Sequence, residues 1–477
     1  MNKEINVAYH EVDFLLPTHR FNIQFSYVTK KGLPFVREFV LRLIHISPMS
    51  PVEIATYFGF SKRELDEALT DLVDKGDLTF SESGKIELTS KSHGYFVGLG
   101  STPMVSLLVE SGGMFTFELA SFNCLGRKRT NEKWTPGLRL DVANETVANS
   151  EQLAKKKFQE QFHKIQEKGF WEHKSNEEKP ERPSIYTMGA VEKLGQEPMR
   201  LTCYLSIDPD GVPVERSDFD ALDDSSIVQE LITDAIVSSQ KPMNLKQIAH
   251  AMAALEDNET KTLFNEYSIN VPLLLDSQQS GKLNDGAWIP FLGPLYSQAN
   301  WQLIADYLEI QLAAIEKTVD RVEEMLWIAP SDGYWGQSVR TASVFSELID
   351  RSIIKGKNSV KLYDTKLYLP VRDSEDRQAI GRWKQEFSEH NKTVFGLVEG
   401  FLDGNVEVLL LPGYMAVVSY HISKPESLPV SLPVGYITTD PNRVEVVTKL
   451  VKNYLNGMIS FNNPRNLGLL EKIEIKH

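Results

Sequence analysis

The sequence has little cysteine, no long apolar run and no export signal. Only Cys124 and Cys203 occur among its 477 residues, far apart and each near strand-like residues, which excludes a disulfide framework and a cysteine metal site. No run of about 18 apolar residues could span a membrane. The first residues lack the apolar segment and cleavage site of a secretory signal. We therefore expect a cytoplasmic protein with no membrane contact and two reduced, buried thiols.

The short motifs that bind nucleotides or catalytic metals are also missing. There is no G-x-x-x-x-G-K-[ST] phosphate loop, no G-x-G-x-x-G and no H-E-x-x-H, so nucleotide hydrolysis, dinucleotide use and zinc-protease chemistry lack their minimal residues. The sequence predicts no cofactor and no metal, and it favours a non-enzymatic role.

Length and charge set two further limits. A chain of 477 residues exceeds what one core usually serves, so two to four domains of roughly 100 to 200 residues are expected. The chain carries 51 Lys and Arg against 65 Asp and Glu, a net charge of −14. Since a net negative charge repels a polyanion at long range, any contact with nucleic acid must be local.

The first hundred residues combine helix caps, apolar stripes and two short strands. Residues 21–29 alternate as a strand does, and a helix with an apolar stripe follows from Pro34. Ser50 precedes Pro51 as a helix N-cap, and Ser61 with Glu64 matches a capping box. Two short strands, near 78–80 and 86–88, complete the order. The phrase SPVEIATYFGFSKRELDEALTDLVDKGDLTF resembles the winged helices of bacterial regulators and DNA-processing proteins, whose third helix usually enters the major groove.

Charge decides what such a winged helix could bind. The segment from Ser50 to Ser90 holds four Lys or Arg against nine Asp or Glu, a net charge of −5, which is acidic for a DNA reader. Only the start of the third helix, with Lys62 and Arg63, and the turn at Lys85 are suited to phosphates. The module is therefore expected either to touch nucleic acid through these cations or to dock a protein.

A basic loop is the strongest candidate for binding an anion. Arg127, Lys128, Arg129 and Lys133 lie close together with Trp134. Such cations can neutralise backbone phosphates while an indole stacks on an unpaired base. A solvated surface loop is the alternative. The charged helix expected over 149–169 also carries three adjacent lysines, but glutamates four residues away supply partners within the helix.

The C-terminal part alternates strands and helices, after a helix expected over 299–327. Its apolar strands predict an α/β domain with a mixed sheet covered on both faces. This part of the chain resembles the phospholipase D-like nuclease fold in three segments, which are residues 326–331, GNVEVLLLPGYMAVVSYHISK and LPVGYITTD. That family uses a histidine and a lysine separated by one residue, whereas here His421 and Lys424 are separated by two residues and the pair occurs once. The resemblance implies a degenerate member, with these two residues as the catalytic candidates.

These observations predict a multi-domain α+β chain with a winged helix, a central mixed region and a C-terminal α/β domain. The expected parts are 1–98, the winged helix with its preceding strand; 99–240, a β-rich mixed domain with an exposed linker near 173–184; 241–323, a helical region; and 324–477, the α/β domain.

Three functions fit this organisation. The first is a non-enzymatic, DNA-associated accessory protein of a prokaryotic DNA-processing or antiviral defence system, with DNA and a partner protein as its contacts. The second is a phosphodiesterase that uses His421 and Lys424. The third is a protein-interaction subunit that never touches nucleic acid. The sequence is compatible with an oligomer in each case.

Overall fold

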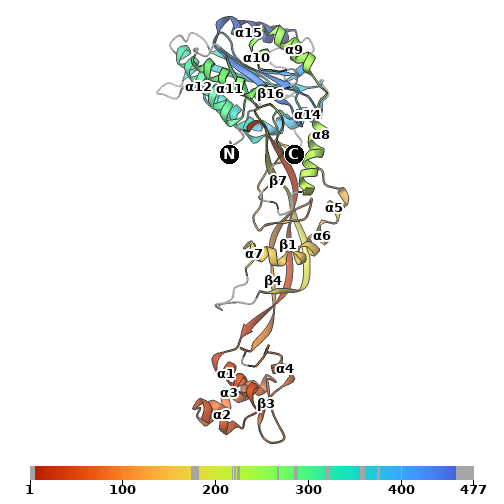
Figure 1. The fold of residues 1–477 in the computed structure, drawn as a ribbon, viewed down its shortest axis with the longest axis vertical. Coiled ribbons are helices and arrows are strands. Elements are labelled where there is room, and N and C mark those ends of the chain that lie inside the picture. The colour runs from red at the N-terminus through yellow and green to blue at the C-terminus, as the bar shows by residue number, and fades with distance from the viewer. Residues whose placement is uncertain are drawn as a thin grey trace.

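A computed structural model shows an elongated molecule with a body, a stalk and a tip (Figure 1). It describes residues 6–99, 101–172, 182–216, 219, 222, 226–265, 268–283, 288–316, 322–354, 360–372, 376–390, 392–398 and 400–457. Helices and mixed sheets are both present, which confirms the α+β class. No helix in the described part of the chain is long and apolar enough to cross a membrane.

The stalk is built on one very long strand. Strand β1 (Val7–Gly32) pairs antiparallel with β4 (Met104–Glu118) along its second half and with β7 (Ser184–Ile207) along most of its length. The short β5 (Cys124–Gly126) and β6 (Leu138–Arg139) add to the same sheet. The 26 residues of β1, at about 3.4 Å each, span roughly 85 Å.

One face of the stalk is covered by short helices. These are α5 (Asn144–Ala148), α6 (Ser150–Glu160) and α7 (Phe162–Glu167). Buried aromatic side chains alternate along the strands and pack against Phe158, Phe162 and Trp171. The predicted helix over 149–169 breaks at Gln161, because that side chain accepts from Cys124 N and donates to the carbonyl oxygen of Phe122. Hydrogen bonds to the chain at the start of β5 therefore divide the expected helix into α6 and α7.

The chain between β1 and β4 forms a separate cluster at the far end of the stalk, here called the tip module (residues 33–99). It contains α1 (Phe35–Ile46), α2 (Pro51–Phe58), α3 (Lys62–Asp74), β2 (Leu78–Phe80), β3 (Ile86–Leu88) and α4 (Ser90–His93). Both predicted capping boxes are present, at Ser50 and at Ser61. The module has its own small core, centred on Val40, Ile54 and Leu72.

The body is a seven-stranded mixed sheet in the order β13-β12-β9-β14-β15-β16-β8. Its strands are β8 (Ile289–Leu292), β9 (Glu323–Ile328), β12 (Tyr363–Val371), β13 (Val394–Val398), β14 (Val406–Leu411), β15 (Met415–Ile422) and β16 (Leu432–Thr438). Strand β12 runs parallel to β9 and β13, and the other pairs are antiparallel. The expected mixed sheet is thus confirmed.

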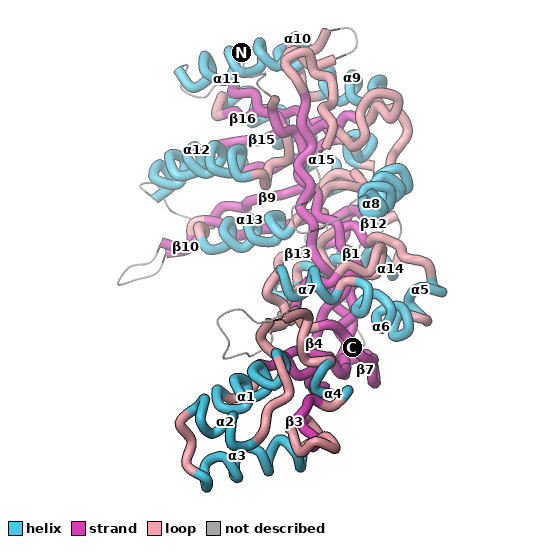
Figure 2. Tube along the Cα trace, turned by 60° about the horizontal axis from the view of Figure 1, so that its bottom comes forward, coloured by secondary structure: helices cyan, strands magenta, loops and turns pink. Residues whose placement is uncertain are grey.

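Helices cover both faces of this sheet (Figure 2). One face packs against α12 (Gln298–Glu316), α13 (Val339–Asp350) and α14 (Arg377–Glu386). The other packs against α8 (Ser226–Ser239), α9 (Leu245–Ala254), α11 (Val271–Leu283) and α15 (Pro441–Asn456), together with the start of β1. The remaining elements are α10 (Glu259–Thr262), β10 (Ile353–Ile354), β11 (Val360–Lys361), η1 (Ser388–His390) and η2 (Phe401–Gly404).

Several sequence expectations about element limits need correction. The strand expected at 21–29 is the second half of β1, which runs unbroken through Pro17. The helix expected over 299–327 ends at Glu316, and Glu323–Ile328 is the central strand β9. The strand expected at 325–329 is confirmed as β9, so only the limit of the preceding helix was wrong.

The sheets also cross the expected domain limits. Strand β1, from the first part, is the centre of the sheet that holds β4 and β7 from the second. Strand β8, from the helical region, is an edge strand of the body sheet. Most of the linker expected near 173–184 lies outside the described residues, and β7 already begins at Ser184.

A buried joint fixes the stalk to the body. Asp13 on β1 accepts from Arg200 Nη1 at 3.1 Å, Thr202 Oγ1 at 2.7 Å and Val339 N at 3.0 Å. Asp13 N in turn donates to the carbonyl oxygen of Gln337 at 2.7 Å. One fully buried carboxylate thus bonds β7 and the start of α13 at once.

Replacing Asp13 by alanine should lower the free energy of unfolding by about 3 kcal/mol, because the largely buried Arg200 guanidinium loses its partner. Urea unfolding followed by circular dichroism measures the change. Asp66→Ala, at an exposed position on α3, should change stability by less than about 0.5 kcal/mol. Equal effects of the two substitutions would contradict the role of Asp13.

Candidate functional site

The predicted tip cations lie at the start of α3. Ser61 caps this helix: its backbone N donates to Glu64 Oε2 at 2.9 Å, and that bond lowers the pKa of Glu64. Lys62 and Arg63 follow in the first turn, exposed to solvent. The Arg63 side chain is 88% exposed and its Nε lies 3.4 Å from Glu67 Oε1. Such an exposed pair contributes little energy, so both cations can meet a ligand.

Lys85 occupies the turn between β2 and β3, also exposed. In the described part of the chain neither Lys62 nor Lys85 forms an ion pair. Other tip cations are neutralised inside the module, since Asp71 bonds both Arg37 and Lys75. The structure therefore leaves cations at the two places where the sequence expected phosphate contacts, on a module that is acidic overall.

The basic loop lies on the stalk rather than at the tip. The Arg127 guanidinium sits 6.0 Å from the Phe115 ring centre, and Arg129 lies 3.9 Å from Glu197. The carbonyl oxygen of Lys128 accepts from Thr116 Oγ1 at 3.0 Å. These contacts fix the backbone and two of the three side chains against the sheet, while all three cations remain exposed.

The two cation groups are far apart along β1. Thr116, beside the basic loop, pairs with Arg20, and the tip module begins just after Gly32. Twelve strand residues at about 3.4 Å each place the start of the tip module roughly 40 Å from the loop, and Lys62, Arg63 and Lys85 lie within that module. No compact ligand could contact both groups.

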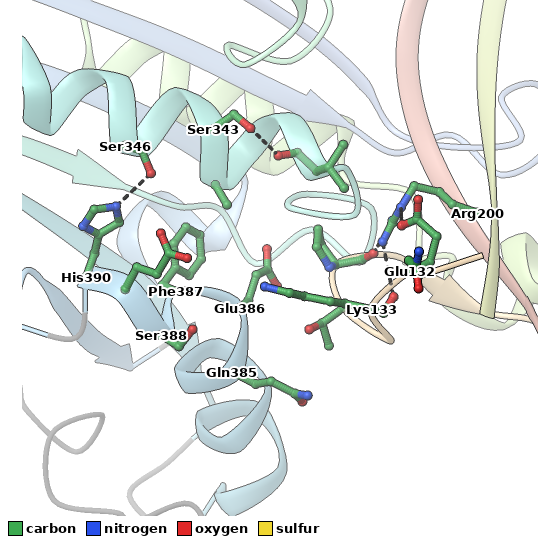
Figure 3. Close-up of a pocket in the computed structure, with 16 residues that line it drawn as sticks. Glu132, Lys133, Arg200, Ser343, Ser346, Gln385, Glu386, Phe387, Ser388 and His390 are labelled. Atoms are coloured by element: carbon green, nitrogen blue, oxygen red, sulfur yellow. Dashed lines mark hydrogen bonds and ion pairs between the residues drawn. The ribbon is translucent and has the colours of Figure 1, made fainter. Parts of the chain in front are cut away.

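Trp134 and Lys133 lie apart from the other residues of the basic loop. The Trp134 ring is half-buried and carries the Arg139 guanidinium 5.1 Å from its centre. Stacking on a base would have to displace or share that cation. Lys133 instead lines a pocket of about 370 Å³ between the loop and the body (Figure 3).

Arg200 holds this loop in place. Its Nη1 donates to the Pro136 carbonyl oxygen at 2.6 Å, its Nε to Glu132 at 3.0 Å and its Nη2 to the Lys133 carbonyl oxygen at 3.3 Å. Arg200 belongs to β7 and its side chain is only 9% exposed. Sequence reasoning missed this residue, because a single arginine in an alternating strand carries no distinguishing signal.

The opposite wall of the pocket comes from α13 and from residues 385–390 (Figure 3). Ser346 Oγ lies 2.8 Å from His390 Nε2. The Glu386 atom Oε1 is buried without a hydrogen-bond partner among the described residues, and burial raises the pKa of Glu386 to about 8. The carboxyl therefore keeps its proton at neutral pH and can donate a hydrogen bond.

This pocket has the chemistry of a small polar binding site. A hydroxyl next to an imidazole is part of a nucleophile arrangement, but catalysis needs a third group that orients the imidazole. Among the described residues no carboxylate contacts His390. Lys133 and the hydroxyl groups of α13 can instead bind a small polar or anionic group.

His421 has a different environment from the one its sequence pattern implied. Its Nδ1 lies 2.9 Å from Asp332 Oδ2 and its Nε2 lies 3.2 Å from Glu407 Oε2. Glu407 Oε1 accepts from the indoles of Trp327 at 2.9 Å and Trp335 at 2.7 Å. The His421 residue is only 3% exposed.

This buried network holds His421 in its charged form. Burial alone disfavours the imidazolium, but the hydrogen bonds to Asp332 and Glu407 outweigh it and raise the pKa of His421 to about 9. Burial likewise opposes ionisation of Asp332, yet contacts with His421 lower the pKa of that carboxyl to about 2. A nucleophilic histidine needs an unprotonated nitrogen that faces the substrate, and His421 offers none.

Lys424 is not part of these contacts. His421 and Glu407 point to the face of the body sheet that carries Trp327, and Ile422 points to the other face. Lys424 lines an apolar cavity together with Ile422. The expected histidine–lysine site is therefore divided between the two faces of the sheet.

The described residues contain no group of three or more His, Cys, Asp or Glu side chains that could hold a metal ion. The two cysteines are buried and free. Comparisons with protein families, with curated proteins and with solved structures found no match to this chain.

The buried network should make stability depend on His421 protonation. Because the folded pKa of His421 is raised to about 9 from 6.5, its contribution is complete below pH 6.5 and is lost as the pH rises through 9. The destabilisation of His421→Gln relative to the natural protein should therefore shrink between pH 7 and 9.5. Urea unfolding at several pH values measures it, with His250→Gln, at an exposed position, as the control. A difference that stays constant with pH would contradict a charged His421.

Proposed function

We propose that this chain is a non-enzymatic, DNA-associated accessory protein of a prokaryotic DNA-processing or antiviral defence system, and that its tip module works as a winged helix. The observation that carries the proposal is the position of Lys62, Arg63 and Lys85. They lie at the start of the third helix and in the turn of the two-stranded sheet, beyond the far end of β1, a strand of roughly 85 Å whose first part packs in the body. A winged helix uses these two places to approach DNA.

Local cations explain how an acidic chain can bind a polyanion. Lys62 and Arg63 are exposed at the start of α3, and the stalk keeps them far from the body. Arg127, Lys128 and Arg129 supply a second contact, roughly 40 Å along β1 from the start of the tip module. At 3.4 Å per base pair, about 12 base pairs cover this part of the separation.

The body is proposed as the platform for a protein partner, with a degenerate phospholipase D-like sheet. The environment of His421 supports the absence of catalysis, because both ring nitrogens are engaged by carboxylates. Because Asp13 on β1 bonds both β7 and the start of α13, a partner bound to the body would stand at a fixed place relative to the stalk.

A second function, a protein-interaction subunit without nucleic-acid contact, is favoured by a specific observation. The tip module exposes large apolar side chains, which suit a protein surface better than a phosphate backbone. They are Phe35, Ile46, Val52, Tyr57 and Phe80. Its acidic balance agrees with this alternative.

A salt titration separates the two functions. Fluorescence anisotropy should show saturable, salt-sensitive binding to DNA without cleavage on a gel. Replacing Lys62, Arg63 and Lys85 together by alanine, or Arg127, Lys128 and Arg129 together, should weaken binding about equally for all sequences. The slope of log affinity against log salt should fall by about one for each phosphate that the variant no longer neutralises.

The matched control is the triple alanine variant of Lys155, Lys156 and Lys157, because Glu160 already pairs with two of these lysines on α6. It should bind as the natural protein does. No binding by the natural protein at about 50 mM salt would favour the interaction subunit.

Duplex length gives a separate prediction. If one duplex contacts both cation groups, affinity should rise steeply at a length above about 12 base pairs, because that length covers only the roughly 40 Å of β1 between the loop and the start of the tip module. Anisotropy with duplexes of increasing length measures this. In the variant of Arg127, Lys128 and Arg129 the step should disappear, and a step that persists there would show that the loop is not the second binding group.

A further inference from the structure

A large cavity in the body lies beneath α9, on the face of the sheet opposite to the His421 network. Its volume is about 890 Å³, within the range of small-molecule sites. Its walls come from the turn at 211–213, from α9, from residues 261–265 and 268–269, and from the chain at the ends of β15 and β16. Neither the stalk nor the tip contributes to it.

The cavity has an apolar floor and an apolar mouth. Residues of the floor are almost fully buried, among them Ile248, Met252 and Ile269. At the mouth Val212 is 56% exposed, Met243 48% and Leu245 41%. Leaving three large apolar side chains in water around one opening is unfavourable. Covering them with an apolar ligand would recover that energy.

Two methionines make the cavity adaptable. Met243 lies at the mouth and Met252 on the floor. Methionine side chains are unbranched and polarisable, so they fit chains of variable shape. These walls suit a flexible aliphatic chain better than a rigid planar ring.

The charged residues of the cavity wall determine which charge on a ligand would be favourable there. Among the described residues of the cavity wall, Lys261 and Lys424 are the cations and Glu426 is the acid. Two ammonium groups beside one carboxylate favour a ligand with a negative head group. This gives Lys424 a place in a binding site of its own, separate from His421.

We propose that this cavity binds an anionic amphiphile, with its aliphatic chain on the floor beneath α9 and its negative head group at Lys261 and Lys424. A free long-chain carboxylate and a single-chain phospholipid share this chemistry. The proposal does not depend on DNA binding.

The experiment uses the full chain and three ligands with the same 18-carbon chain, kept below their aggregation concentrations. These are oleate, oleyl alcohol and oleylamine, with binding followed by displacement of a fluorescent fatty acid. Oleate should bind saturably and about tenfold more tightly than oleyl alcohol, because the alcohol lacks the charge-assisted bonds. Oleylamine should bind most weakly. Oleoyl lysophosphatidate in the same assay distinguishes a carboxylate from a phospholipid head group.

Variants test the two lysines and the floor. Lys424→Met and Lys261→Met should each weaken oleate binding about tenfold and leave oleyl alcohol unchanged, and Lys424→Arg should retain most of the affinity. Lys246→Met, on α9 but outside the cavity lining, is the matched control. Met252→Trp should block all three ligands, and Ala249→Phe at the cavity wall does the same if the tryptophan variant fails to fold by circular dichroism.

Two results would overturn the proposal. Equal affinities for oleate and oleyl alcohol, unaffected by either lysine substitution, would show that no head-group site exists. Absence of binding by the natural protein would leave a segment of a partner protein as the occupant of the cavity.

Discussion

The architecture depends on the continuity of β1. This strand contributes Tyr9, Val12 and Phe14 to the core of the body and Phe21, Ile23 and Phe25 to the core of the stalk. The pairing of β1 with β7 shifts register at four places, but its pairing with β4 is regular from Thr18 to Gly32, so the strand continues without interruption from the body to the tip module. Arg200 and Asp13 secure a place where β1, β7 and the body meet. Backbone hydrogen bonding between β1 and its neighbours thus sets the separation between the body and the tip module.

The buried charged side chains of the body have a structural role, because they bond one another between packed elements. The imidazolium of His421 lies between two carboxylates. The indoles of Trp327 and Trp335 donate to the other oxygen of Glu407, whereas Asp332 Oδ2 accepts from both His421 and Ser431 and its Oδ1 accepts from Tyr334 N at 3.2 Å. A network of this kind specifies one arrangement of β14, β15 and the loop at Asp332, because removing His421 or either carboxylate leaves a buried charge without its partner. The same feature makes it unsuitable for a substrate.

Two pockets described above suit ligands of different chemistry. The pocket between the basic loop and α13 is polar, with Lys133 on one wall and the Ser346–His390 pair on the other. The cavity under α9 is apolar with two lysines. The first pocket lies between stalk and body, since Arg200 of β7 lines it and holds its loop. The second pocket belongs to the body.

The sequence alone determined the local features of the tip and of the body strands. Serine caps at Ser50 and Ser61 and apolar runs such as Val406–Leu411 act through neighbours in the chain, so their pattern is readable. Only the tertiary structure decided that β1 continues through Pro17, that the helix before β9 ends at Glu316, and that Arg200 positions Lys133. It also decided that His421 and Lys424, separated by only two residues, serve opposite faces of one sheet. Those outcomes depend on pairing and burial between segments far apart in sequence, and no local pattern records them.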